Sequence, residues 1–335
     1  MAAAGKQEHL REEDREFFER ELASFVPERV FDAHAHLWHR DQYPEELPPG
    51  FPPTTTHDDY LRLVECLFPG RQVGGWFLPK PSLRNGDRDR LGASEWVATN
   101  VAGKRFARGA FLVLPDDDPE WIREQVKRLG LCGFKCYHVF AKSKPTWQAA
   151  IPDYLPEQLV RVAGEEGWVI TLHMVTSRAA ADPGNIHWIR RYCTSYPDMK
   201  LILAHSARGF QPAHNFEGLP QLGGLGNLYF DASANCEPLA HESIIRIMGH
   251  EKLMNGTDFG GASHGRGRSV AAADTFIWLY ENTPVWEQPN GLARPVLIAL
   301  EYLRSLKWAC WSAKLTDSQV EDIFWNNAAG VFGIK

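Results

Sequence analysis

Two histidines separated by a single alanine, His34 and His36, have a type and spacing that suggest chemistry. They follow the apolar pair Val30 and Phe31, which is typical of a buried strand. Side chains two positions apart on a strand point to the same face, so both imidazoles would project together. Neutral imidazole is the commonest metal ligand among protein side chains. The pair therefore indicates either a metal site or two buried rings that only fill space.

Further polar residues lie in or at the ends of apolar runs along the chain: Lys135 in 132–140, His173 in 168–175, His205 in 200–207 and Asp258 in 252–260. Three imidazoles and one carboxylate suit Zn²⁺ and are acceptable to Mn²⁺, Fe²⁺ or Co²⁺. We therefore expect one divalent ion, with zinc first and manganese or iron as alternatives, bound by His34, His36, His173 and Asp258.

The elements that must position these residues alternate between strands and helices. Eight apolar runs predict strands, at 29–36, 73–79, 107–115, 132–140, 168–175, 200–207, 227–234 and 252–260. Spacing and capping residues predict helices at 7–25, 58–68, 94–104, 118–130, 156–167, 183–197, 237–250, 293–306 and 317–330. This order predicts an α/β fold, a (β/α)8 TIM barrel, in which the carboxyl ends of the strands share one face. A doubly wound sheet is the alternative, but FDAHAHLWHR has no glycine for a phosphate loop.

The domain organisation follows from the same pattern. We expect an N-terminal helical extension over 1–28 and a single barrel domain over 29–335, with a long loop at 261–292. The net charge of −6 excludes the basic surface that nucleic acid or an anionic membrane would require. Six cysteines without a CxxC pair favour reduced thiols, and neither a signal peptide nor a membrane helix is evident. We therefore expect a cytoplasmic protein, monomeric or homo-oligomeric, that binds a small-molecule substrate.

The ordered motifs FDAHAH, GFK, TLH, LAH, GTDFG and EDIFWNNAAGVFGI resemble the amidohydrolase superfamily, specifically its amidohydrolase family 2 branch. The resemblance runs from about residue 29 to 334. It implies that His34, His36 and His173 bind the metal and that Asp258 completes the set and acts as general base. It also implies that His205 hydrogen-bonds the water or the substrate oxygen, or binds a second metal.

Other residues have alternative interpretations. Lys135 resembles the carbamylated bridge of binuclear relatives, but an ion pair or a substrate carboxylate contact would also explain it. Arg208 follows His205 in the sequence Ser-Ala-Arg-Gly. It either binds a carboxylate through two guanidinium N–H groups or is a solvated loop residue. We expect Trp38 to belong either to a lid with aromatic walls or to a segment that packs on the outside of the barrel. His264 and Arg266 are second-rank candidates for substrate binding.

These residues favour metal-assisted hydrolysis of a small amide, lactone or ester, carboxylated if Arg208 binds it. Non-oxidative decarboxylation or hydration of an aromatic or unsaturated carboxylic acid on the same site is the alternative. A barrel without catalysis is the third hypothesis, and the intact set of His34, His36, His173, His205 and Asp258 argues against it.

Overall fold

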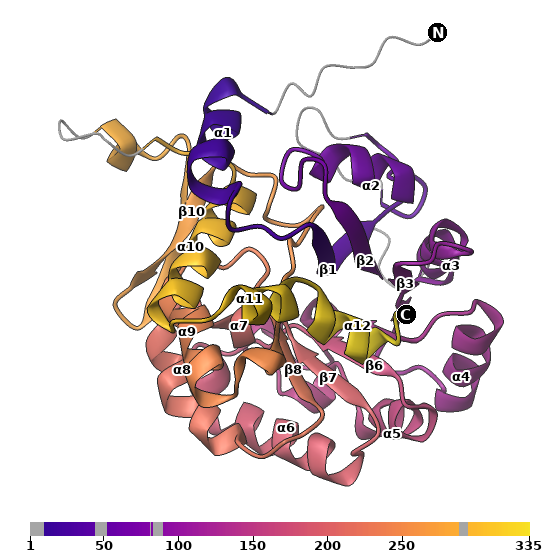
Figure 1. Ribbon diagram of the computed structural model, residues 1–335. Helices are drawn as coiled ribbons and strands as arrows, with labels where there is room; N and C mark the ends of the chain where they lie inside the picture. The colour runs from indigo at the N-terminus through magenta and orange to yellow at the C-terminus, as the bar shows by residue number, and fades with distance from the viewer. Residues whose placement is uncertain (1–9, 44–51, 81, 83–89, 288–293) are drawn as a thin grey trace, which may run out of the picture.

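The computed structural model describes residues 10–43, 52–80, 82, 90–287 and 294–335 (Figure 1). Parallel strands form its centre. They are β1 (Arg29–Leu37), β2 (Gln72–Pro79), β3 (Ala107–Gly109), β4 (Phe111–Leu112), β5 (Gly133–Cys136), β6 (Val169–Leu172), β7 (Lys200–Leu203), β8 (Leu228–Asp231) and β9 (Leu253–Met254). The strand order is β1-β2-β3 in one sheet and β4 through β9 in another.

The two sheets close into one barrel. Strands β3 and β4 are a single run interrupted at Ala110, which pairs with β2 by donating its N–H to the Phe77 carbonyl at 2.9 Å. At the other seam, the chain after β9 pairs with β1, since Ala33 donates to Asn255 and His36 donates to Phe259. Eight parallel strands with closed edges make a TIM barrel, which confirms the predicted fold class.

Helices cover the outside of the barrel, and Figure 1 shows α4, α5, α6 and α8 around strands β6 to β8. The α-helices after the N-terminal segment are α2 (His57–Val64), α3 (Arg90–Val101), α4 (Pro119–Arg128), α5 (Glu157–Glu166), α6 (Pro183–Ser195), α8 (Pro212–Gly218), α9 (Pro238–Ile247), α10 (Ile298–Ser312), α11 (Asp317–Glu321) and α12 (Asn327–Phe332). Asp118 and Asp182 cap α4 and α6, each helix beginning with proline, as their sequences predict.

The interior of the barrel is packed in layers. Phe31, Trp76, Ile202 and Met254 belong to one buried cluster with the C-terminal residues of the chain. Phe332, at the end of α12, stacks on Phe31 with ring centroids 5.3 Å apart. The closing helix therefore plugs the amino-terminal end of the barrel and leaves the opposite end for a site.

Several predicted segments differ from the structure. The strands expected at 132–140, 168–175 and 252–260 end early, at Cys136, Leu172 and Met254. The strand expected at 200–207 ends at Leu203, because the next residues turn with positive φ. The loop expected over 261–292 contains an antiparallel hairpin, β10 (Gly267–Ala272) and β11 (Thr275–Tyr280), whose alternation of aromatic and other residues is typical of a strand. Residues 288–292 of that loop lie outside the described residues, as does most of the proline-rich segment after Tyr43.

The N-terminal segment is a short helix, α1 (Glu12–Phe17), continued by a wider turn at Phe18–Leu22. Asp14 on α1 forms a buried ion pair with Arg266 next to the hairpin. Residues 1–9 lie outside the described residues, and the domain boundary at 28/29 stays a prediction. Within the described part of the chain, every helix is too short or too polar to cross a membrane.

Candidate metal centre and substrate pocket

An irregularity in β1 sets the direction of the two histidines. The pairing of β1 with β2 shifts register between Asp32 and Ala35. Such a bulge rotates the following side chains relative to the alternation of a regular strand. Asp32 therefore faces outward, where it accepts hydrogen bonds from Tyr60 Oη at 2.9 Å and from Thr257. A regular strand would place Asp32 on the same face as His34 and His36, and the bulge is the reason that it does not lie there.

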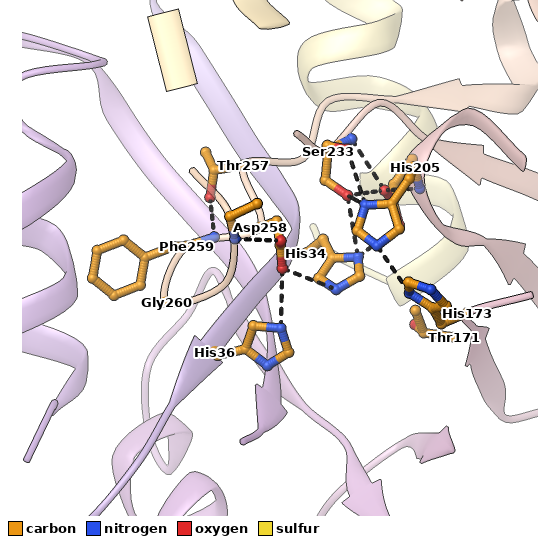
Figure 2. A network of polar contacts seen from close by, with 12 residues as sticks. His34, His36, Thr171, His173, His205, Ser233, Thr257, Asp258, Phe259 and Gly260 are labelled. Carbon is orange, nitrogen blue, oxygen red and sulfur yellow. Dashed lines mark hydrogen bonds and ion pairs between the residues drawn. The ribbon is translucent and has the colours of Figure 1, made fainter. Parts of the chain in front are cut away.

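His34, His36 and Asp258 come together at the carboxyl end of the barrel (Figure 2). Asp258 Oδ1 lies 3.2 Å from His36 Nε2 and 3.7 Å from His34 Nε2. All three side chains are buried. Asp258 adopts a left-handed backbone conformation with φ of 56° and accepts the N–H of Ala262 at Oδ2. One carboxylate oxygen therefore faces two imidazole nitrogens, an arrangement suited to a shared cation.

Two residues that the sequence analysis missed orient these rings. Asp231, the last residue of β8, lies 2.9 Å from His34 Nδ1 through Oδ2. Tyr137 Oη lies 3.3 Å from His36 Nδ1 and donates to the Pro79 carbonyl. Both contacts place a proton on Nδ1 and leave the lone pair of Nε2 directed at Asp258. Asp231 lies in the second half of the predicted strand 227–234, and a carboxylate in an otherwise apolar run was the available signal.

His173 and His205 lie next to this group. His205 Nδ1 is 3.0 Å from the Ser233 carbonyl, and its Nε2 is 3.2 Å from His173 Nδ1. If His205 donates to the carbonyl, its Nε2 accepts from His173, and His173 Nε2 keeps a lone pair. That Nε2 atom is buried and has no hydrogen-bond partner. An orphaned buried nitrogen of this kind is available to a metal. Among the described residues, however, the ligand atoms of His34, His36 and Asp258 lie within 4.8 Å of one another, and His173 is not part of this group.

The electrostatics of the site agree with a cation-binding set. Burial lowers the pKa of His36 to about 4 and lowers the pKa values of His173 and His205. Burial alone would raise the pKa of Asp258, but its close contacts with the imidazoles of His36, His34 and His205 outweigh this effect and lower the pKa. Neutral imidazoles beside an ionised carboxylate are the protonation states that a divalent metal requires.

A left-handed turn carries His205 and Arg208. The four residues 205–208 have φ between 52° and 59°, and the turn is drawn as α7 (Ala204–Arg208) in Figure 1. Left-handed backbone costs about 1–2 kcal/mol per residue that has a Cβ atom. Because such strain persists only where surrounding groups determine it, it is typical of functional sites.

Buried polar side chains hold this turn in place. Asp231 accepts the His205 N–H, and Asn235 donates to the His205 carbonyl at 3.1 Å. Asn215 donates to the Ser206 carbonyl at 3.0 Å, and the Ser206 hydroxyl lies 2.7 Å from His241 Nδ1. The strained backbone is therefore fixed from several elements at once.

Arg208 lies in a pocket of about 160 Å³ that opens beside the imidazoles. Its guanidinium carbon is 5.7 Å from the ring centre of Trp147 and 5.8 Å from that of Phe276. Nη1 donates to the Thr176 carbonyl at 2.7 Å, and no carboxylate among the described residues forms an ion pair with it. The pocket is lined by His173, His205, Asp258, Arg208, Ala234, Ala262, Trp147, Phe210, Phe276 and Trp278.

The other predicted substrate residues lie elsewhere. Trp38 is buried, stacks on Phe259 and donates its indole N–H to the Pro52 carbonyl at 3.2 Å. Arg266 pairs with Asp14, and neither Arg266 nor His264 is among the described residues that line the pocket. Lys135 is buried in the barrel interior with Nζ 5.0 Å from the centre of the Tyr137 ring, and burial lowers its pKa.

Comparison with known proteins decides the family. The model of the amidohydrolase family (Amidohydro_2) matches residues 31–334, which is nearly the whole chain. The chain belongs to this family. It is therefore an amidohydrolase-family enzyme, and its family is metal-dependent, in agreement with the candidate site formed by His34, His36 and Asp258. A search of curated protein sequences gave no match.

Several solved structures share the fold. A probable 2-pyrone-4,6-dicarboxylic acid hydrolase from Acinetobacter baumannii is 14% identical over 91% of this chain and 99% of that protein, with a TM-score of 0.54. The 5-carboxyvanillate decarboxylase from Sphingomonas paucimobilis is 12% identical over 92% and 100%, with a TM-score of 0.55. The 2,6-dihydroxybenzoate decarboxylase from Rhizobium is 12% identical over 91% and 98%, with a TM-score of 0.52. The proteins of similar fold thus include a probable hydrolase and two decarboxylases, which are the two reaction types expected from the sequence.

Proposed function

We propose that this amidohydrolase-family enzyme hydrolyses a small amide, lactone or ester that carries a carboxylate. The observation that carries the proposal is the placement of a half-buried arginine, Arg208, in the same pocket as Asp258 and the imidazoles, with no acidic partner among the described residues. A partly desolvated cation of this kind is satisfied by an anionic group of the substrate. The guanidinium would fix the carboxylate while the reacting bond lies toward Asp258.

We propose that His34, His36, His173 and Asp258 hold one divalent ion, and that zinc is the native metal because the donor set is three imidazoles and one carboxylate. When bound, such an ion supplies Lewis acidity to a substrate oxygen and acidifies a water molecule. The protein's own groups then manage protons and position. Asp258 would take a proton from the attacking water and return it to the leaving group.

His205 has a narrower role in this scheme than the sequence suggests. Because its Nδ1 faces the Ser233 carbonyl, its Nε2 presents a lone pair rather than a proton. Because this Nε2 already accepts from His173 Nδ1, we propose that His205 orients the His173 imidazole and does not act as a neutral donor to an oxyanion.

Decarboxylation of an aromatic or unsaturated carboxylic acid is the second candidate. Four aromatic side chains line the pocket, Trp147, Phe210, Phe276 and Trp278, and this lining favours a planar substrate. The substrate would use the same Arg208, and its scissile carboxylate would face the residues proposed to hold the ion.

One experiment separates the two reactions. The zinc-loaded enzyme is incubated with lactones, amides and aromatic acids in H₂¹⁸O, and products are analysed by mass spectrometry together with released CO₂. Incorporation of ¹⁸O into a new carboxylate of the organic product supports hydrolysis, and release of CO₂ with no ¹⁸O in the organic product supports decarboxylation. Asp258→Asn serves as the inactive control. Turnover that is unchanged in this variant would contradict both reactions at this site.

We also propose a cytoplasmic location. All six cysteines are unbridged, which agrees with a reducing compartment.

A further inference from the structure

The β10–β11 hairpin presents two different faces. Phe276 and Trp278 alternate with Ile277 on β11, so they lie on one face of the strand and Ile277 on the other. Phe276 and Trp278 line the pocket, whereas Ile277 is 47% exposed. The face toward the pocket therefore carries the aromatic rings. Ile277, on the opposite face of the same strand, offers a matched control for substitutions of these rings.

A column of rings connects the hairpin to the imidazoles. His205 and Phe210 have centroids 5.8 Å apart, and Phe210 stacks on Phe276 at 4.4 Å with an interplanar angle of 21°. Trp278 approaches Phe210 from the side at 5.6 Å. The position of the two hairpin rings relative to His205 is therefore set by direct packing.

Polar contacts hold the hairpin over the pocket at both ends. At the root, Ser269 Oγ accepts the N–H of Cys236 at 3.0 Å. At the tip, Asp274 lies 3.0 Å from His214 Nε2, and Gln211 donates to the Ala273 carbonyl at 2.6 Å. An element anchored at both ends presents its rings in one orientation, as a selective binding surface requires.

The dimensions of the pocket match a single ring. An apolar cavity of about 150 Å³ is large enough to bind benzene, and this pocket measures about 160 Å³. The guanidinium carbon of Arg208 is 5.8 Å from the centre of the Phe276 ring, and Phe276 and Trp278 line the same pocket. A ring whose carboxylate binds this guanidinium would therefore be placed next to these two side chains.

We infer that the β10–β11 hairpin is the specificity element of this enzyme, and that Phe276 and Trp278 select a planar ring bearing a carboxylate over a puckered one of the same size. The inference rests on the proposed function in so far as the pocket is the substrate site. It assigns a role to a segment that contributes none of the proposed metal ligands.

The test measures binding of two probes to the zinc-loaded enzyme by isothermal titration calorimetry, without turnover. Benzoate is planar and cyclohexanecarboxylate is puckered, and both carry one carboxylate. The wild type should prefer benzoate. Phe276→Leu and Trp278→Leu, which keep apolar bulk, should each weaken benzoate binding by about two- to tenfold and leave cyclohexanecarboxylate nearly unchanged. Ile277→Leu should retain the wild-type preference.

Phe276→Tyr and Trp278→Phe keep a planar ring and should keep the preference if a leucine variant does not fold. Equal binding of the two probes to the wild type, or a preference that survives both leucine substitutions, would overturn the inference. Because binding is measured separately from catalysis, a ring-selective enzyme that converts neither lactones nor aromatic acids would disprove the proposed function and leave the hairpin's role intact.

Discussion

Replacing Asp231 with asparagine should weaken metal binding without unfolding the barrel. Asp231 uses Oδ2 for His34 Nδ1 and Oδ1 for the N–H groups of His205 and Ser233. An amide can accept on only one side. Its NH₂ group then faces either the His205 N–H or His34 Nδ1, and in the second case the proton of His34 moves to Nε2, which removes the lone pair directed at Asp258.

The expected magnitude follows from these contacts. Loss of a partner that orients a metal-binding imidazole lowers metal affinity about 10- to 100-fold, equivalent to about 1.4–2.8 kcal/mol. This agrees with the 1.5–3 kcal/mol typical of one hydrogen bond to a charged group.

The assay is competition for Zn²⁺ against a fluorescent chelator, with thermal unfolding recorded in parallel. Asp32→Asn is the matched control, because Asp32 is equally buried but contacts the His34 backbone N–H and not its ring. We expect zinc affinity to fall at least tenfold more in Asp231→Asn than in Asp32→Asn. Equal zinc affinities in the two variants would refute the proposed role of Asp231.

Three further predictions address other parts of the site. Arg208→Ala should raise KM for a carboxylated substrate about 10- to 100-fold with a smaller change in kcat; an unchanged KM in steady-state assays would exclude Arg208 as the carboxylate ligand. Lys135→Met should retain about one zinc per chain by elemental analysis, since we propose a single ion; two ions in the wild type and one in the variant would instead indicate a bridging carbamate. Burial lowers the pKa of His241 to about 4, against 6.5 in the unfolded chain, so the unfolded chain binds the extra proton between these values. The His241 contribution to stability is therefore complete above pH 6.5 and falls by up to about 3 kcal/mol as the pH approaches 4. Urea unfolding of His241→Asn should show a shallower loss of stability between pH 7 and 4.5, and slopes equal to those of the wild type would contradict this assignment.

The barrel could be predicted from the sequence because the patterns that indicate its strands and helices are local. Apolar runs, proline-started helices and polar residues at strand ends appear within short windows, and they located His34, His36, His173, His205 and Asp258. The bulge in β1 was not predictable, because a one-residue shift depends on pairing with β2 and with the chain after β9. The same limit hid the roles of Asp231 and Tyr137, whose partners are distant in sequence.

Trp38 and Arg266 show that sequence also suggests contacts that the fold does not form. Their positions near the predicted ligands suggested substrate contacts, but packing partners in distant segments hold them away from the pocket. Proximity in sequence to a strand end does not fix where a long side chain points, since that depends on which neighbours offer an ion pair or a stacking surface.

The left-handed turn at 205–208 implies a compromise between stability and activity. Glycine adopts positive φ without the Cβ penalty, yet this chain carries Ser206, Ala207 and Arg208 there. Glycine at Ala207 would relieve strain but would widen the range of conformations open to the backbone that carries both His205 and Arg208. The enzyme therefore has a lower folding free energy at this turn but keeps two functional groups at a constant separation, and we expect substitutions that raise the thermal stability of the turn to lower turnover.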